Sequence, residues 1–156
     1  MNNVTVAGQF HIAAAVVSLA TGAVQSVRPK GDRLHRGTGY VYAASMLLTN
    51  LSALLIYRFT GRFNVFHALA LFSLFSVGMA LRPMLQKPRP ANWLLTHYMW
   101  ILWSYVGLWA ATVTEILVRV VRVSGWTSAA VGTALVMAIG AGCIVKFAPR
   151  PSAHHG

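Results

Sequence analysis

Acidic side chains are nearly absent from this sequence. Asp32 and Glu115 are the two acids among 156 residues, and charged residues of both signs make up only 10% of the chain. A soluble domain carries roughly 25% charged residues, and two carboxylates cannot cover a surface that faces water. Because 56% of the residues are hydrophobic, the composition excludes an ordinary soluble domain and indicates an integral membrane protein.

Cysteine and the common catalytic motifs are equally scarce. The single cysteine, Cys143, cannot form an intrachain disulfide, and the chain has no CxxC or CxxCH motif. Thiol redox chemistry and covalent haem attachment are therefore not expected. The sequence also lacks a P-loop, a GxGxxG, an HExxH and a nucleophile elbow, and a hydrolase with only two acids is not expected.

Basic residues, by contrast, are abundant: thirteen Lys and Arg give a formal net charge of +11. They lie almost entirely between apolar runs, so membrane topology and anionic lipid explain them better than a nucleic-acid partner does. Nine lie on one predicted side of the membrane: Arg28, Lys30, Arg33, Arg36, Arg82, Lys87, Arg89, Lys146 and Arg150. Four lie on the other: Arg58, Arg62, Arg119 and Arg122. The larger group is expected in the cytoplasm, beside anionic lipids, which puts the N-terminus outside and the C-terminus inside.

Five apolar segments have the length of about 20 residues that a helix needs to cross a bilayer. The predicted spans are Val4–Val27, Leu34–Tyr57, Val65–Leu85, Trp93–Val118 and Ser128–Val145. Because the connections are short, neighbouring helices should run antiparallel. The expected fold is all-α: a four-helix antiparallel transmembrane bundle plus a fifth transmembrane helix. Residues 1–147 are expected to form one domain, and residues 148–156 a disordered C-terminal tail.

One histidine lies near the start of each of the first four segments: His11, His35, His67 and His97. An ionisable side chain is costly inside a bilayer, so each is a functional hypothesis. At 1.5 Å per residue, His11 and His67 lie about 24 and 27 Å from the inner ends of their helices. His35 and His97 lie within about 6 Å of the inner boundary. The sequence therefore predicts two pairs, each on helices that face one another diagonally across the bundle.

Such pairs suit haem, because its iron takes axial imidazole ligands from opposite faces of the ring. His11 with His67 and His35 with His97 would hold up to two b haems, one near each membrane surface. The propionates would find cations at both levels. Lys30, Arg33 and Arg36 flank the inner pair, and Arg58, Arg62 and Arg119 flank the outer pair.

Glu115 leaves an alternative open. It lies 18 residues after His97, on the same face of its helix. Its favoured role is an ion pair with Arg119, but with His11 and His67 it would form a ligand set for zinc or non-haem iron. In that reading, as in the haem one, the four histidines are the candidate metal ligands. A third possibility is a structural or assembly subunit without a cofactor, whose histidines lie in the membrane interface.

Small and polar residues predict which helix faces point inward, since such residues pack between membrane helices. His11, Ser18 and Gln25 recur at seven-residue spacing on the first segment, with Thr21 and Gly22 beside them. Tyr42, Met46 and Asn50 mark the inward face of the second segment, and Ser104, Tyr105 and Thr112 mark that of the fourth. On the fifth segment, Ala130, Ala134, Ala138 and Gly142 form a small-xxx-small face that could dock it on the bundle or make a homo-oligomer.

Two stretches resemble known families. Lys30, Gly31, Arg33, Leu34, His35, Arg36, Gly39 and Tyr42 form a KGxRLHRxxGxxY-type segment. Together with the later His97, Met99, Ser104 and Tyr105 it resembles an uncharacterised group of small bacterial multi-helix membrane proteins. More distantly, the four histidines resemble the ligands of the transmembrane diheme b-type cytochromes that ascorbate reduces. This chain is shorter, has five helices rather than six, and shows no ascorbate-site signature.

The leading hypothesis is a b-type cytochrome of the bacterial inner membrane that carries electrons across or within the bilayer. It would be a transmembrane electron carrier or oxidoreductase whose redox partner the sequence does not identify.

Overall fold

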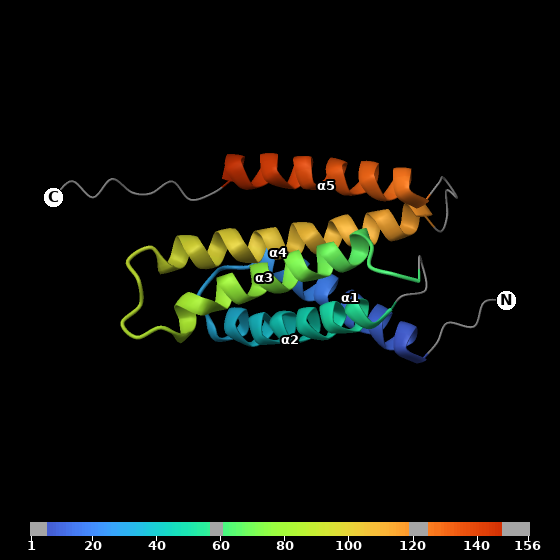
Figure 1. Cartoon of the computed structure of the whole chain (residues 1–156). Helices are drawn as coiled ribbons and strands as arrows, with labels where there is room; N and C mark the ends of the chain where they lie inside the picture. The colour runs from blue at the N-terminus through green and yellow to red at the C-terminus, as the bar shows by residue number, and fades with distance from the viewer. Residues whose placement is uncertain (1–5, 57–60, 119–124, 148–156) are drawn as a thin grey trace.

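The computed structural model describes residues 6–56, 61–118 and 125–147, and these form five α-helices (Figure 1). The helices are α1 (Val6–Val27), α2 (Arg33–Leu55), α3 (Val65–Leu85), α4 (Trp93–Ile116) and α5 (Gly125–Phe147). The described residues contain no strand, so the all-α prediction is confirmed. The predicted bounds of α3, the end of α1 and the start of α4 are those observed, and the other ends differ by one to three residues.

The helices form two hairpins that pack side by side. α1 packs against α2 and α3 against α4; the hairpins meet mainly through α2 and α3, and α5 lies on α4 outside the four-helix bundle (Figure 1). Neighbouring helices run in opposite directions. One end of the bundle, called the basic end here, therefore carries the α1–α2 and α3–α4 connections and these described cations: Arg28, Lys30, Arg33, Arg36, Arg82, Lys87 and Arg89.

Local sequence fixes where α2 and α3 begin. Gly31, with φ of +93°, turns the chain after α1 in a conformation that glycine adopts without strain. Asp32 then caps α2 by accepting a hydrogen bond of 2.6 Å from the His35 backbone N–H. Asn64 caps α3 in the same way, accepting from the Phe66 N–H at 2.9 Å. Each cap satisfies a backbone donor that the helix cannot.

The centre of the bundle is packed with side chains from three helices. Tyr42 and Met46 of α2, Val77 of α3 and Leu108 of α4 form the buried core cluster. Gly22 of α1 lets this core approach closely, because a Cβ there would lie 2.3 Å from the Tyr105 ring. Of the predicted inward faces, Ser18, Gly22, Tyr42, Met46, Asn50 and Ser104 are buried, whereas His11, Thr21, Gln25, Tyr105 and Thr112 are half-buried.

The outer surface of the helices is apolar. Large hydrophobic side chains are exposed on all five, for example Phe10, Leu48, Phe75, Trp109 and Ile139. Within the described residues, three helical segments are long and apolar enough to cross a membrane: Val6–Val27, Val65–Leu85 and Ala129–Lys146. An all-helical membrane protein accounts for both observations, because lipid covers the apolar surface that water would not.

The fifth helix docks through a different face from the predicted one. A Cβ at Gly140 would lie 2.4 Å from Val106 Cγ1, and Ala129 is 1% exposed, so these residues face α4. The whole predicted small-residue face is exposed, namely Ala130, Ala134, Ala138 and Gly142. The expectation that this face docks α5 on the bundle is therefore wrong. The expected tail at 148–156 lies outside the described residues, and so do Arg58, Arg119, Arg122 and Arg150.

Candidate functional site

His97 lies in the second turn of α4 and is held by the neighbouring helix. Its Nδ1 lies 2.9 Å from the Ala80 carbonyl oxygen of α3. A carbonyl can only accept a hydrogen bond, so Nδ1 carries the ring proton and donates. The lone pair on Nε2 is then available to a metal or a proton, and the hydrogen bond at Nδ1 fixes the orientation of the ring.

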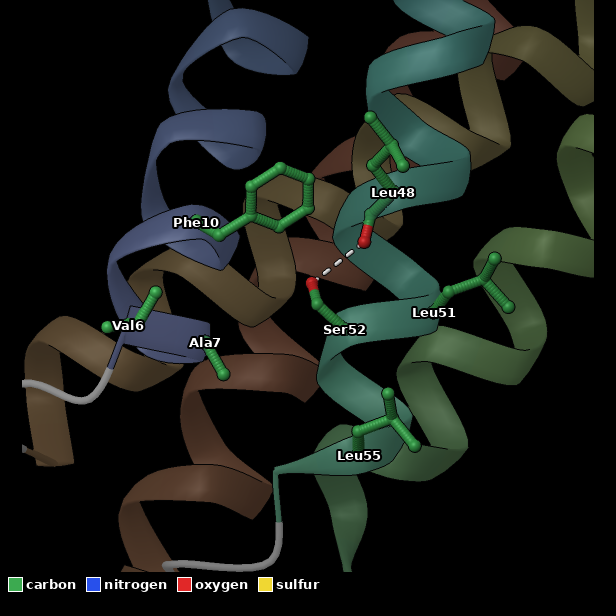
Figure 2. A pocket seen from close by; sticks show the side chains of 7 residues that line it. All are labelled: Val6, Ala7, Phe10, Leu48, Leu51, Ser52 and Leu55. Atoms are coloured by element: carbon green, nitrogen blue, oxygen red, sulfur yellow. Dashed lines mark hydrogen bonds between the residues drawn. The ribbon is translucent and has the colours of Figure 1, made fainter.

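His11 has the same arrangement on the other hairpin. Its Nδ1 lies 3.1 Å from the Thr49 carbonyl oxygen and 2.9 Å from Ser52 Oγ, both on α2. The Ser52 hydroxyl donates within its own helix, to the Leu48 carbonyl at 2.7 Å (Figure 2). Its oxygen can therefore accept from His11, and this histidine also presents Nε2 as its free lone pair.

His35 lies in the first turn of α2 and is half-buried. Gln25 of α1 reaches it by donating from Nε2 to the His35 carbonyl oxygen at 2.7 Å. Gly39 makes room for this amide, because a Cβ there would lie 2.9 Å from Gln25 Nε2. The Nδ1 of His35 is buried and has no hydrogen-bond partner among the described residues.

His35 and His97 lie at one level of the bundle, as predicted. Tyr42 Oη and Ser104 Oγ are 2.8 Å apart across the core, joining α2 to α4. Each lies seven residues after a histidine, about 10 Å or two helical turns, on the same face of its helix. Both helices start at the basic end, so the two histidines share a level.

His67 behaves differently from the other three. It is 1% exposed, and its Nδ1 accepts a hydrogen bond of 3.3 Å from the Asn64 backbone N–H, which completes a capping box at the start of α3. An accepting Nδ1 places the ring proton on Nε2. His67 would have to give up this cap bond before Nε2 could act as a ligand.

The predicted three-ligand metal set is not assembled. Within residues 6–56, 61–118 and 125–147, no three His, Cys, Asp or Glu side chains form a group that could hold a metal ion. His11, His67 and Glu115 all lie within these ranges. Glu115 is half-buried in the last turn of α4, and Arg119, its predicted ion-pair partner, lies outside the described residues.

The cations predicted at the inner level are present where His35 lies. Arg33 and Arg36 are exposed in the first turn of α2. The Arg28 guanidinium lies 3.5 Å from the Asp32 carboxylate. The backbone N–H of His35 holds the pKa of the Asp32 carboxyl below its ordinary value of 3.8, and Arg28 acts in the same direction. At the opposite end Arg62 is exposed.

A sequence comparison identifies the family. Residues 8–147 match the family described as "Predicted membrane protein (DUF2306)". The chain belongs to the DUF2306 family. No curated protein and no solved structure matches the chain. The resemblance to an uncharacterised membrane-protein family is thus confirmed, whereas this match does not extend to the diheme cytochromes.

Two features of this DUF2306 member escaped the sequence analysis. One is the set of hydrogen-bond partners of the histidines. Thr49 and Ser52 contact Nδ1 of His11, Ala80 contacts Nδ1 of His97, and Gln25 donates to the His35 carbonyl. The other is an apolar groove of about 500 Å³ between the start of α1 and the end of α2 (Figure 2). It is lined by Val6, Ala7, Phe10, Leu48, Leu51, Ser52 and Leu55. Thr49 and Ser52 lie on a polar face of α2 that the sequence shows, but the sequence does not indicate which histidine contacts them.

Proposed function

We propose that this DUF2306 protein is a b-type cytochrome of the bacterial inner membrane, an electron carrier that holds haem through His35 and His97. A second haem would be held by His11 and His67. The observation that carries the proposal is the 2.9 Å contact from His97 Nδ1 to the Ala80 carbonyl. Histidines that bind metals through Nε2 characteristically donate Nδ1–H to such an acceptor.

The donor set suits haem at the basic end better than at the other. His97 has the tautomer that a ligand needs, and His35 lies at the same level with its Nδ1 unpaired. At the opposite end His11 has that tautomer too, but His67 is engaged as a helix cap. We therefore expect the His35–His97 site to bind first and more tightly.

Haem supplies a one-electron redox centre when it is bound; the residues of the chain supply its place and surroundings. Ala80 fixes the His97 ring, and Lys30, Arg33 and Arg36 offer cations for propionates at the basic end. Arg58 and Arg62 are the corresponding candidates at the other end. Tyr42 and Met46, 2% and 0% exposed, fill the space between the two levels and exclude water from it.

The proposed topology is that of the sequence prediction. All five helices cross the bilayer, the N-terminus lies outside, and the basic end lies in the cytoplasm. The buried Ser45, Thr49 and Asn50 side chains of α2 lie in the bundle interior, where they are covered from lipid. A redox partner would approach either surface.

The test is a reduced-minus-oxidised spectrum with a haem count on protein purified in mild detergent from haem-replete cells. We expect b-type bands and one to two haems per chain. His97→Asn is the informative variant, because its amide can still donate to the Ala80 carbonyl but cannot replace the imidazole as a ligand. It should lose the haem at the basic end, while His154→Asn should lose none.

Two results would replace this proposal. A protein without a Soret band that carries stoichiometric zinc or iron would favour the non-haem alternative with His11, His67 and Glu115. A colourless, metal-free and folded protein would favour the structural or assembly subunit.

A further inference from the structure

Five residues where α1 meets α2 form a compact polar group, called here the α1–α2 cap cluster: Gln25, Arg28, Lys30, Asp32 and His35. Asp32 connects two members, because its carboxylate pairs with Arg28 at 3.5 Å and accepts the His35 backbone N–H at 2.6 Å. Gln25 connects His35 to Lys30: its side-chain amide donates to the His35 carbonyl, and its backbone carbonyl accepts from Lys30 Nζ. The cluster is thus held together independently of any ligand.

Three polar atoms of this cluster are buried and unsatisfied. Gln25 Oε1, Arg28 Nε and His35 Nδ1 have no hydrogen-bond partner among the described residues. A buried polar atom without a partner destabilises the fold, and proteins leave few of them. Arg28 Nε–H is a donor, His35 Nδ1–H can be one, and Gln25 Oε1 is an acceptor. A ligand that satisfies all three must accept two hydrogen bonds and donate one.

The charge of the surroundings selects an anion. Asp32 is the only acid of the basic end, and its carboxylate is already engaged by Arg28 and His35. Lys30, Arg33 and Arg36 provide three cations within residues 30–36. Arginine and lysine together are a common phosphate-binding set.

The neighbouring surface selects an amphiphile. Val27 and Leu34 flank the cluster on α1 and α2 and are 84% and 49% exposed. Apolar side chains of this kind lie beside acyl chains where cations lie beside headgroups.

We propose that the α1–α2 cap cluster binds the headgroup of an anionic phospholipid that carries a free hydroxyl, of the phosphatidylglycerol type. The phosphodiester oxygens accept from Arg28 and His35, with Lys30 beside them, and the headgroup hydroxyl donates to Gln25 Oε1. This site does not depend on the proposed haem, because His35 uses only Nδ1 here and keeps Nε2 available.

The full chain, purified in a non-ionic detergent and stripped of lipid, is titrated with phosphatidylglycerol, phosphatidylethanolamine or phosphatidylcholine of equal chain length. Bound lipid is counted by native mass spectrometry, and the unfolding temperature is followed in parallel. Phosphatidylglycerol is expected to bind at one copy per chain and to raise the unfolding temperature, with at least tenfold preference over the other two. Glycerol phosphate without acyl chains is the arm that separates a lipid from a soluble phosphate.

Arg28→Lys is the sharpest variant, because it keeps the charge but removes the Nε–H, and Gln25→Leu removes the acceptor. Each is expected to weaken phosphatidylglycerol binding at least fivefold. Arg82→Gln removes a cation from the same end outside the cluster, and it should change binding less than twofold.

Equal binding of the three lipids would overturn the proposal, as would equal losses in Arg28→Lys and Arg82→Gln, since both indicate unspecific charge attraction. Arg28-dependent binding of glycerol phosphate at the affinity of the lipid would support the phosphate site and assign it to a soluble ligand.

Discussion

At the scale of single residues, the tautomer of each histidine depends on the atom that its Nδ1 contacts. Carbonyl oxygens behind His11 and His97 set one tautomer, and a backbone N–H at His67 sets the other. The histidines therefore differ in whether Nε2 can bind a metal, although each lies near the start of its helix. Testable predictions of the same local origin concern Gly22 and Asp32.

Gly22→Ala is expected to lower stability although alanine favours helices. Its Cβ would lie 2.3 Å from Tyr105 Cε2 and 3.1 Å from Tyr42 Cε2. The Tyr105 ring cannot move away freely, because its hydroxyl donates to the Leu19 carbonyl at 3.2 Å. Overpacking costs about 1–3 kcal/mol, against a helix-propensity gain of up to about 1 kcal/mol.

The measurement is thermal unfolding in detergent, with Gly78→Ala as the matched control. Gly78 is also helical, but a Cβ there meets nothing within 4 Å, so this variant should be neutral or slightly stabilised. Equal unfolding temperatures for the two variants would contradict the packing described around Gly22.

Because of Asp32, the stability of the folded protein is expected to depend on pH in the acidic range. Its pKa lies below the ordinary 3.8 because the ionised carboxylate accepts the His35 N–H and pairs with Arg28. A lowered pKa stabilises the folded state above the unfolded value, and this contribution is lost as the pH falls through the folded value. Stability should therefore drop below about pH 4. Asp32→Asn keeps a capping acceptor without the charge, so its unfolding temperature should vary less between pH 6 and pH 2.5 than that of the parent.

At the scale of helices, the bond between Tyr42 and Ser104 joins α2 to α4 and sets the level of the two histidines behind them. Tyr42→Phe should cost about 1 kcal/mol, since Ser104 keeps its bond to the Ile101 carbonyl. Ser104→Ala should cost about 1–3 kcal/mol, because it leaves a buried hydroxyl unpaired.

The double variant should cost less than the sum of the two, which a double-mutant cycle of unfolding free energies measures. Tyr40→Phe, at a side chain 76% exposed on the same helix, is the control and should change little. Strict additivity in the cycle would mean that the two hydroxyls do not interact.

The helices themselves were largely predictable, and the reason lies in local sequence. The bounds of α3 were predictable because its apolar run is bounded by polar connections, with Asn64 before it and a proline-containing segment after it. The shared level of His35 and His97 follows from helical rise alone. The cap at His67 was also within reach, since Asn64 and His67 have the N-cap-to-N3 spacing.

The tautomers of His11 and His97 were not predictable, because their acceptors come from other helices, 38 and 17 residues away. The docking face of α5 was not predictable either. Gly132 and Gly140 on one face and Ala134 and Gly142 on another are equally small, and only packing against α4 distinguishes them.

At the scale of the whole molecule, the exposed face of α5 is free to meet a second copy of the chain. We expect the protein to self-associate through Ala130, Ala134, Ala138 and Gly142, as close-packed membrane helices do. Gly142→Leu should then convert oligomers to monomers, as measured by light scattering in detergent. Gly140→Leu should instead lower stability by displacing α5 from Val106. An unchanged oligomeric state in Gly142→Leu would exclude this face.

The division into two hairpins has a consequence for how the chain enters a membrane. α1 and α3 are apolar enough to partition on their own, whereas α2 carries Ser45 and Thr49, which the bundle covers. The Ser18 hydroxyl donates to Ser45 at 2.8 Å. A polar group of α2 is therefore hydrogen-bonded by α1, the helix synthesised just before it. We expect α1 and α2 to enter the membrane together as one hairpin, and α3 and α4 as another, so that biosynthetic insertion proceeds in units of two helices.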